Sequence, residues 1–175
     1  MRPDAAADAG PTRLFQALVA RLDEVGIDSF VKLGSGMAPE QLLVALPPDG
    51  AGRVLHLQVM FLPDMDPAVL QFFVGLPDRA DDEGLDALAR FLCAANVVLP
   101  VGQFGLVEDQ RLVYFRHNVA VADAPLDFDL FGWTVTMAQF VVANIGPLVE
   151  AVAGGRLDLP AARRRLADAL DPADA

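Results

Sequence analysis

The sequence predicts an α+β fold in which helices alternate with an antiparallel sheet. Apolar residues recur at helical spacing in the segments 13–25, 81–96, 127–144 and 160–170. Short apolar or alternating runs, typical of strands, lie at 41–47, 53–63, 69–77 and 101–117. Short connections between neighbouring strands favour antiparallel pairing. The predicted order is a helix, a three-stranded antiparallel meander, a helix, a β-hairpin, a long helix and a short C-terminal helix.

Length and composition favour one domain with a well-packed core. The chain has 175 residues, of which 54% are hydrophobic, enough for one core and short for two domains. We expect a single α+β domain at 12–155, a flexible N-terminal segment at 1–11 and a short helical extension at 156–175. The arginines at 163–165 are expected on the solvated face of that extension.

The first half of the domain is expected to contain the first helix and the meander. Thr12 can cap a helix over 13–25, and Gly26 is expected to end it. The turn-forming residues at 47–52 and 63–67 separate the three strands. The buried positions of the second and third strands are expected to be Leu55, Leu57, Val59 and Phe61, and Leu70, Phe72, Val74 and Leu76.

A second helix is expected over 81–96, with acids at 81–83 in its first turn, where the helix dipole favours negative charge. Its buried face is expected to contain Leu85, Leu88, Ala89 and Leu92. Cys93 is expected near that face as an inert small hydrophobe. As the chain's one cysteine, it excludes an intramolecular disulfide and a four-thiolate zinc site.

The segment 101–117, VGQFGLVEDQRLVYFRH, predicts a hairpin. A loop at Asp109–Gln110 places apolar pairs on one face, namely Phe104 with Phe115 and Leu106 with Val113. The other face then carries the pairs Val107 with Leu112, Gly105 with Tyr114, and Gln103 with Arg116. His117 falls at the end of the apolar face and is interpreted as a structural residue.

The predicted long helix at 127–144 belongs to an uncharged run from Leu130 to Val149, long enough to span a bilayer. Polar residues within the run and the lack of a flanking basic cluster favour a buried core or interface helix instead. Pro147 is expected to kink or end this helix. One stripe is apolar, with Leu130, Trp133, Met137 and Val141, and a second is small and mildly polar, with Gly132, Thr136, Gln139 and Ala143.

Charge and motifs exclude several classes of function. A net charge of −11 argues against nucleic acid and against an anionic membrane surface. Gly34–Pro39 lacks the third glycine of a dinucleotide-binding loop, and Asp127–Gly132 lacks the later acid of a calcium loop. His56 and His117 have no metal-ligand spacing. We therefore predict no enzyme activity, no cofactor and no metal, and we expect a cytoplasmic protein because no signal-peptide core is present.

The hairpin and the long helix after it resemble the YbjN family, which is grouped with the type III secretion chaperone-like fold of the Tir chaperone (CesT) type. The resemblance covers roughly 12–153 and rests on Gly102, Phe104, Glu108–Asp109, Tyr114 and Arg116. The chain differs in having Gln110 where the family commonly has a turn glycine, and in the helix beyond Gly155. The resemblance implies a non-catalytic protein-binding module, often a homodimer.

We therefore expect a small acidic chaperone-like adaptor that acts as a homodimer and binds a protein client. The candidate partner-binding residues are Tyr114, Arg116, Gln103, His56, Gln58, Thr136 and Gln139. The alternative is a regulatory or sensory domain with a closed apolar pocket between sheet and helices, into which His56, Gln58 or Arg116 would converge. A third hypothesis, an enzyme that pairs Cys93 with a histidine, requires a solvent-reachable thiol.

Overall fold

The computed structural model describes residues 11–35, 38–48, 52–80, 84–121 and 126–169. The elements in chain order are α1 (Pro11–Glu24), β1 (Ser29–Lys32), β2 (Gln41–Ala45), β3 (His56–Phe61), β4 (Ala68–Arg79), α2 (Leu85–Val98), β5 (Gln103–Val107), β6 (Leu112–Val121), α3 (Phe128–Ala153) and α4 (Leu159–Ala169). The strands form one sheet in the order β1-β2-β3-β4-β6-β5, with all neighbours antiparallel. The predicted α+β class is confirmed.

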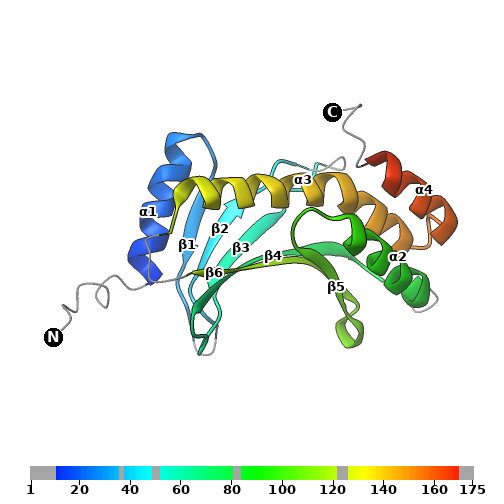
Figure 1. Cartoon of the computed structure of the whole chain (residues 1–175), viewed down its shortest axis with the longest axis horizontal. Helices are drawn as coiled ribbons and strands as arrows, with labels where there is room; N and C mark the ends of the chain where they lie inside the picture. Colours follow the sequence, from blue (N-terminus) through cyan, green and yellow to red (C-terminus); the bar gives the residue numbers. More distant parts are fainter. Residues whose placement is uncertain (1–10, 36–37, 49–51, 81–83, 122–125, 170–175) are drawn as a thin grey trace.

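The core lies between one face of the sheet and the helices. In Figure 1, α3 runs along the sheet, α1 lies near β1, and α2 and α4 lie near the opposite end of α3. Alternate strand residues point toward the helices and are buried, among them Leu57, Val59, Leu70, Phe72, Val74 and Phe115. The predicted buried positions of β3 and β4 are confirmed, except that Leu55 and Phe61 are only half-buried.

The meander has one strand more than predicted. β1 pairs with β2 through Phe30 opposite Leu43, so four consecutive strands run antiparallel from β1 to β4. The prediction missed β1 because four residues are too few to show a strand period. β1 is stabilised by tertiary contacts, because it pairs with β2 and packs against α1.

The hairpin register is confirmed at every predicted pair, from Gln103 opposite Arg116 to Val107 opposite Leu112. The loop is longer than expected, since a 3-10 turn at Glu108–Gln110 is followed by Arg111 with a φ of 54°. Arginine therefore occupies the left-handed position for which glycine is usual. The register survives because the apolar face, and not the loop, selects it.

The second helix buries Leu88, Phe91, Leu92 and Ala95, and its predicted acidic turn at 81–83 lies outside the described residues. Cys93 is exposed, so its predicted place near the buried face was wrong. The burial of Phe91, absent from the prediction, turns the helix so that Cys93 points outward. Near the end of α2, the Asn96 side chain accepts a hydrogen bond from the Phe104 N–H at 2.8 Å and donates one to the Phe104 carbonyl at 2.9 Å. These two bonds occupy the backbone groups of Phe104 at the outer edge of β5.

The long helix does not end near 144 as predicted, because α3 continues through Pro147 to Ala153. Proline removes one intrahelical hydrogen bond, the one from residue 147 to the Ala143 carbonyl. The helix continues because Val149, Val152 and Ala153 beyond the proline are buried in the core. By length and composition α3 can span a membrane, but half of its most apolar window is buried inside this fold. Leu130 and Trp133 of the predicted apolar stripe are exposed.

Candidate binding sites

The outer face of the sheet, opposite the core, carries most of the predicted partner-binding residues. The registers place one row of residues across all six strands, consisting of Phe30, Leu43, Gln58, Phe73, Arg116 and Gln103. Tyr114 and His56 share this face, because each is two residues from Arg116 or Gln58 on its strand. Phe30 is 52% exposed, and Leu43 and Phe73 are half-buried.

Aromatic contacts order the centre of this face. The Phe73 and Tyr114 rings are stacked with centroids 5.3 Å apart, and the Arg116 guanidinium lies 5.7 Å from the Tyr114 ring centre. Gly105 opposes Tyr114 on β5, and a Cβ there would collide with the end of the tyrosine ring. The missing side chain therefore lets Tyr114 extend across β5.

One edge of the sheet is open beside these residues. β6 extends to Val121, but β5 pairs only with Leu112–Arg116. In the described part of the chain, no strand pairs with residues 117–121 on that side. A polar recess of about 300 Å³ lies where β5 begins, lined by Gly102, Gln103, Arg116, His117 and Asn118.

The backbone pattern shows which groups this open edge presents. The Val69 carbonyl accepts from the Leu62 N–H at 2.9 Å, on the β3 side of β4. Val69 therefore makes no ladder bonds to Ala120, its partner on β6. The N–H and C=O of Ala120, and by alternation those of Asn118, point away from β4. They face the open side of β6.

His117 lies on the inner face of β6, with its ring centre 6.3 Å from that of Phe72. Partial burial lowers the pKa of His117 below its ordinary value of 6.5. We expect stability to be fully present above pH 6.5 and to fall as the pH drops below that value, because the unfolded chain binds the proton more tightly. Melting temperatures measured from pH 7.5 down to about 5.5, above most carboxylate titration, test this.

The control for this pH dependence is His117→Gln, which keeps a polar side chain of similar length without a titrating ring. The decrease in melting temperature between pH 7.5 and about 5.5 should be smaller in this variant than in the parent chain. An identical decrease in both proteins would show that another group is responsible.

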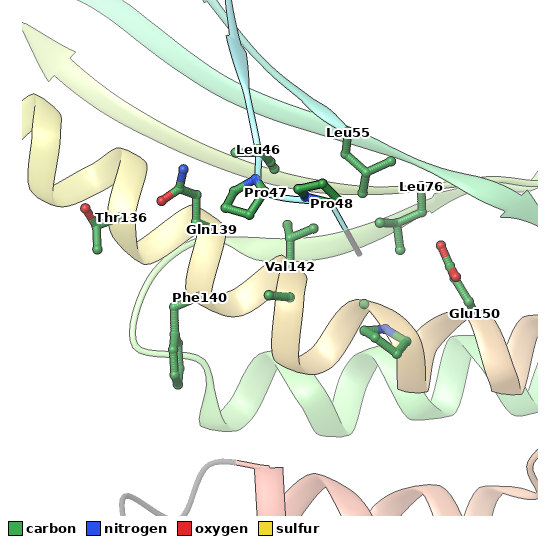
Figure 2. Close-up of a pocket in the computed structure, with 13 residues that line it drawn as sticks. Leu46, Pro47, Pro48, Leu55, Leu76, Thr136, Gln139, Phe140, Val142 and Glu150 are labelled. Carbon is green, nitrogen blue, oxygen red and sulfur yellow. The ribbon is translucent and has the colours of Figure 1, made fainter. Parts of the chain in front are cut away.

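A second candidate site is a pocket between α3 and the ends of β2, β3 and β4 (Figure 2). Its volume is about 380 Å³, within the range typical of small-molecule sites. Leu46, Leu76, Val142 and Gly146 form buried parts of its wall, and exposed residues at the rim include Pro47, Pro48, Ala143 and Pro147. The wall is predominantly apolar.

Glu150 is the charged member of this pocket. Its side chain is only 10% exposed, and its Oε2 accepts from Nη2 of Arg53 at 2.6 Å. Thr136 and Gln139 also line the pocket, whereas the other predicted polar residues do not. The expectation that His56, Gln58 or Arg116 would converge inside such a pocket was therefore wrong, because β-strand alternation places them on the outer face.

The sequence analysis missed the contribution of residues 46–48, of Leu55 and of Glu150 to this pocket. The prolines at 47 and 48 were interpreted only as turn residues, and Glu150 lay beyond the predicted end of the long helix. The helical spacing of Gln139, Ala143, Gly146 and Glu150 is the signal that indicates a shared face once α3 is known to continue past Pro147.

The third hypothesis, an enzyme based on Cys93, has one of its requirements met, since this thiol is exposed on α2. The histidines lie elsewhere, His56 on β3 with its ring against Phe30 and His117 on β6 against Phe72. Within the described residues, no three His, Cys, Asp or Glu side chains gather into a possible metal site.

Comparison of the chain with models of known families, with curated proteins and with solved structures finds no match. The resemblance to the YbjN family therefore stays a prediction.

Proposed function

We propose that this chain is a non-catalytic protein-binding module, a chaperone-like adaptor that acts as a homodimer and takes up an extended segment of a protein client. The observation that carries the proposal is the open edge of β6, where Asn118 and Ala120 direct backbone donors and acceptors away from β4. An extended segment can join such an edge as a further strand.

Within residues 117–121, the edge lacks the side chains that usually protect against strand addition. Residues 117–121, HNVAV, contain no lysine, acid or proline, the residues that commonly block pairing. By contrast, the outer edge of β5 is occupied at Phe104 by the Asn96 amide. The protected and unprotected stretches are adjacent, which favours β6 as the docking position.

The side chains around the edge can add specificity to backbone pairing. Gln103 and Arg116 line the recess at the start of β5 and can donate to carbonyl oxygens of a client. Tyr114 and Phe73 offer an aromatic surface next to Arg116 on the outer face. The net charge of −11 favours clients with basic segments and disfavours nucleic acid and membranes.

The test is the variant Ala120→Pro, which removes the N–H that faces the open edge. Proline is tolerated at edge positions whose N–H faces solvent, so the fold should be retained. Affinity purification of the full chain, with mass spectrometry of bound proteins, should recover about tenfold less client with the variant, since strand addition depends on backbone bonds. Ala120→Thr keeps the N–H and is the matched control.

Equal recovery with Ala120→Pro and Ala120→Thr would overturn docking at β6. Light scattering on the parent chain tests the other part of the proposal, with a mass of twice 18.7 kDa expected. A monomer at every concentration would overturn the homodimer. Neither result depends on the pocket.

The second candidate function is a cytoplasmic regulatory or sensory domain that binds a small ligand. The pocket between α3 and the strand ends favours it, because it lies between sheet and helix and is apolar, as such a domain requires.

A further inference from the structure

We propose that the pocket of Figure 2 binds an uncharged, largely apolar small molecule that carries a hydroxyl or N–H donor. This inference rests on the second candidate function and is independent of client docking at β6. The inference rests on one face of α3, which adds hydrogen-bond acceptors to an otherwise apolar pocket.

The wall of the pocket is built mainly from buried apolar side chains. Leu46, Leu76 and Val142 are at most 5% exposed and lie around the pocket together with Leu55. Gly146 lies on the facing side of α3, where a Cβ would be 3.8 Å from the nearest Leu76 carbon. This is ordinary van der Waals contact, so the missing side chain leaves a small apolar gap beside Leu76. Burial of a ligand ring or alkyl group against the wall of the pocket supplies the main favourable free energy.

The polar groups of the pocket belong to α3. Pro147 has no N–H to donate to the carbonyl of Ala143, and both residues line the pocket. Gln139 lies one turn before Ala143, and Glu150 lies on the same face beyond Pro147. Thr136 also lines the pocket, but its hydroxyl already donates to the Gly132 carbonyl at 3.0 Å. The polar groups of this face are therefore acceptors, apart from the amide of Gln139.

The charge of Glu150 decides what kind of donor fits. Arg53 already bonds to its Oε2, so this carboxylate is compensated and does not demand a cationic ligand. A ligand carboxylate or sulfonate would be buried against Glu150 and the Ala143 carbonyl without a free cation in the pocket wall among the described residues. A neutral molecule with an N–H or O–H group satisfies the acceptors at no such cost.

Two fluorescent dyes with one skeleton test this assignment. N-phenylnaphthylamine is neutral, apolar and carries an N–H, and anilinonaphthalene sulfonate adds only the anionic group. We expect the neutral dye to bind the full chain at one site, and the sulfonate to bind at least about tenfold more weakly, because burying its charge is costly. Equal or tighter binding of the sulfonate would overturn the ligand class.

Variants of α3 locate the dye. Ala143→Phe fills the rim and should weaken binding of the neutral dye about tenfold, and Gly146→Ala, which narrows the pocket, should weaken it less. Gly132→Ala is the matched control, because a Cβ at Gly132 meets nothing within 4 Å. Both glycine variants should raise the melting temperature, which shows that they fold.

Unchanged dye affinity in Ala143→Phe and Gly146→Ala would place the dye elsewhere and overturn the proposal. A change in mass by light scattering in Ala143→Phe, with dye affinity unchanged, would show that the pocket holds a protein side chain instead. Ala120→Pro should leave dye binding intact, so that failure of client docking and failure of this inference are separate results.

Discussion

Replacing Phe131 with alanine is expected to lower the free energy of unfolding by about 3–5 kcal/mol, the usual cost of removing a buried phenylalanine. Phe131 is 1% exposed and lies in the first turn of α3, with its ring centre 5.7 Å from that of Phe72 on β4. The loss combines apolar burial, the cavity left behind and the aromatic contact. Urea denaturation measures it.

Phe140→Ala is the control for Phe131→Ala on the same helix. Phe140 is 37% exposed at the rim of the pocket, so its removal should cost about 1 kcal/mol, within the range for positions outside the core. Similar losses for the two variants would show that α3 is not anchored to the sheet through Phe131.

Gly102→Ala should have the second largest effect, a loss of about 2–5 kcal/mol of stability, from left-handed backbone strain and overpacking together. Gly102 has a φ of +66°, and a Cβ there would collide with the Phe115 ring and lie 2.9 Å from the Arg116 carbonyl oxygen. Phe115 is fully buried, so its ring has no free space to move into. Denaturation curves measure the loss.

Gly105→Ala, three residues further on, is the matched comparison for Gly102→Ala. The nearest obstacle there is the far end of Tyr114, which is half-buried on the outer face and can rotate away. We expect a change within about 1 kcal/mol, since the cost is limited to the aromatic contact with Phe73. A loss as large as that of Gly102→Ala would contradict the role assigned to Phe115.

The elements that were predicted well are those in which the apolar pattern continues over many residues and one face is buried in the core. The hairpin is the clearest case, because Phe104, Leu106, Val113 and Phe115 can share a buried face in only one register. β3 and β4 follow the same rule. β1 was missed because four residues carry no usable period, and its pairing with β2 is a tertiary contact.

The candidate sites were predicted less completely than the fold. Period-two alternation correctly grouped Gln103, Tyr114 and Arg116 on one face. It could not indicate that pairing with β5 reaches only to Arg116 while β6 continues to Val121, since strand lengths depend on which partner is available. The pocket could not be predicted either, because it joins residues 46–48 and Leu55 to α3, which lies about a hundred residues further along the chain.

What local sequence determines here is therefore the α+β class, the hairpin register and the side of the sheet on which each strand residue lies, because these follow from hydrophobic periodicity. Tertiary packing alone decides that α3 continues through Pro147, since buried Val149 and Val152 outweigh one lost hydrogen bond. The same packing turns Cys93 outward and brings Glu150 to Arg53. The contacts of α3 join residues that no local pattern connects and create the pocket, and the limited pairing of β5 along β6 leaves the open edge.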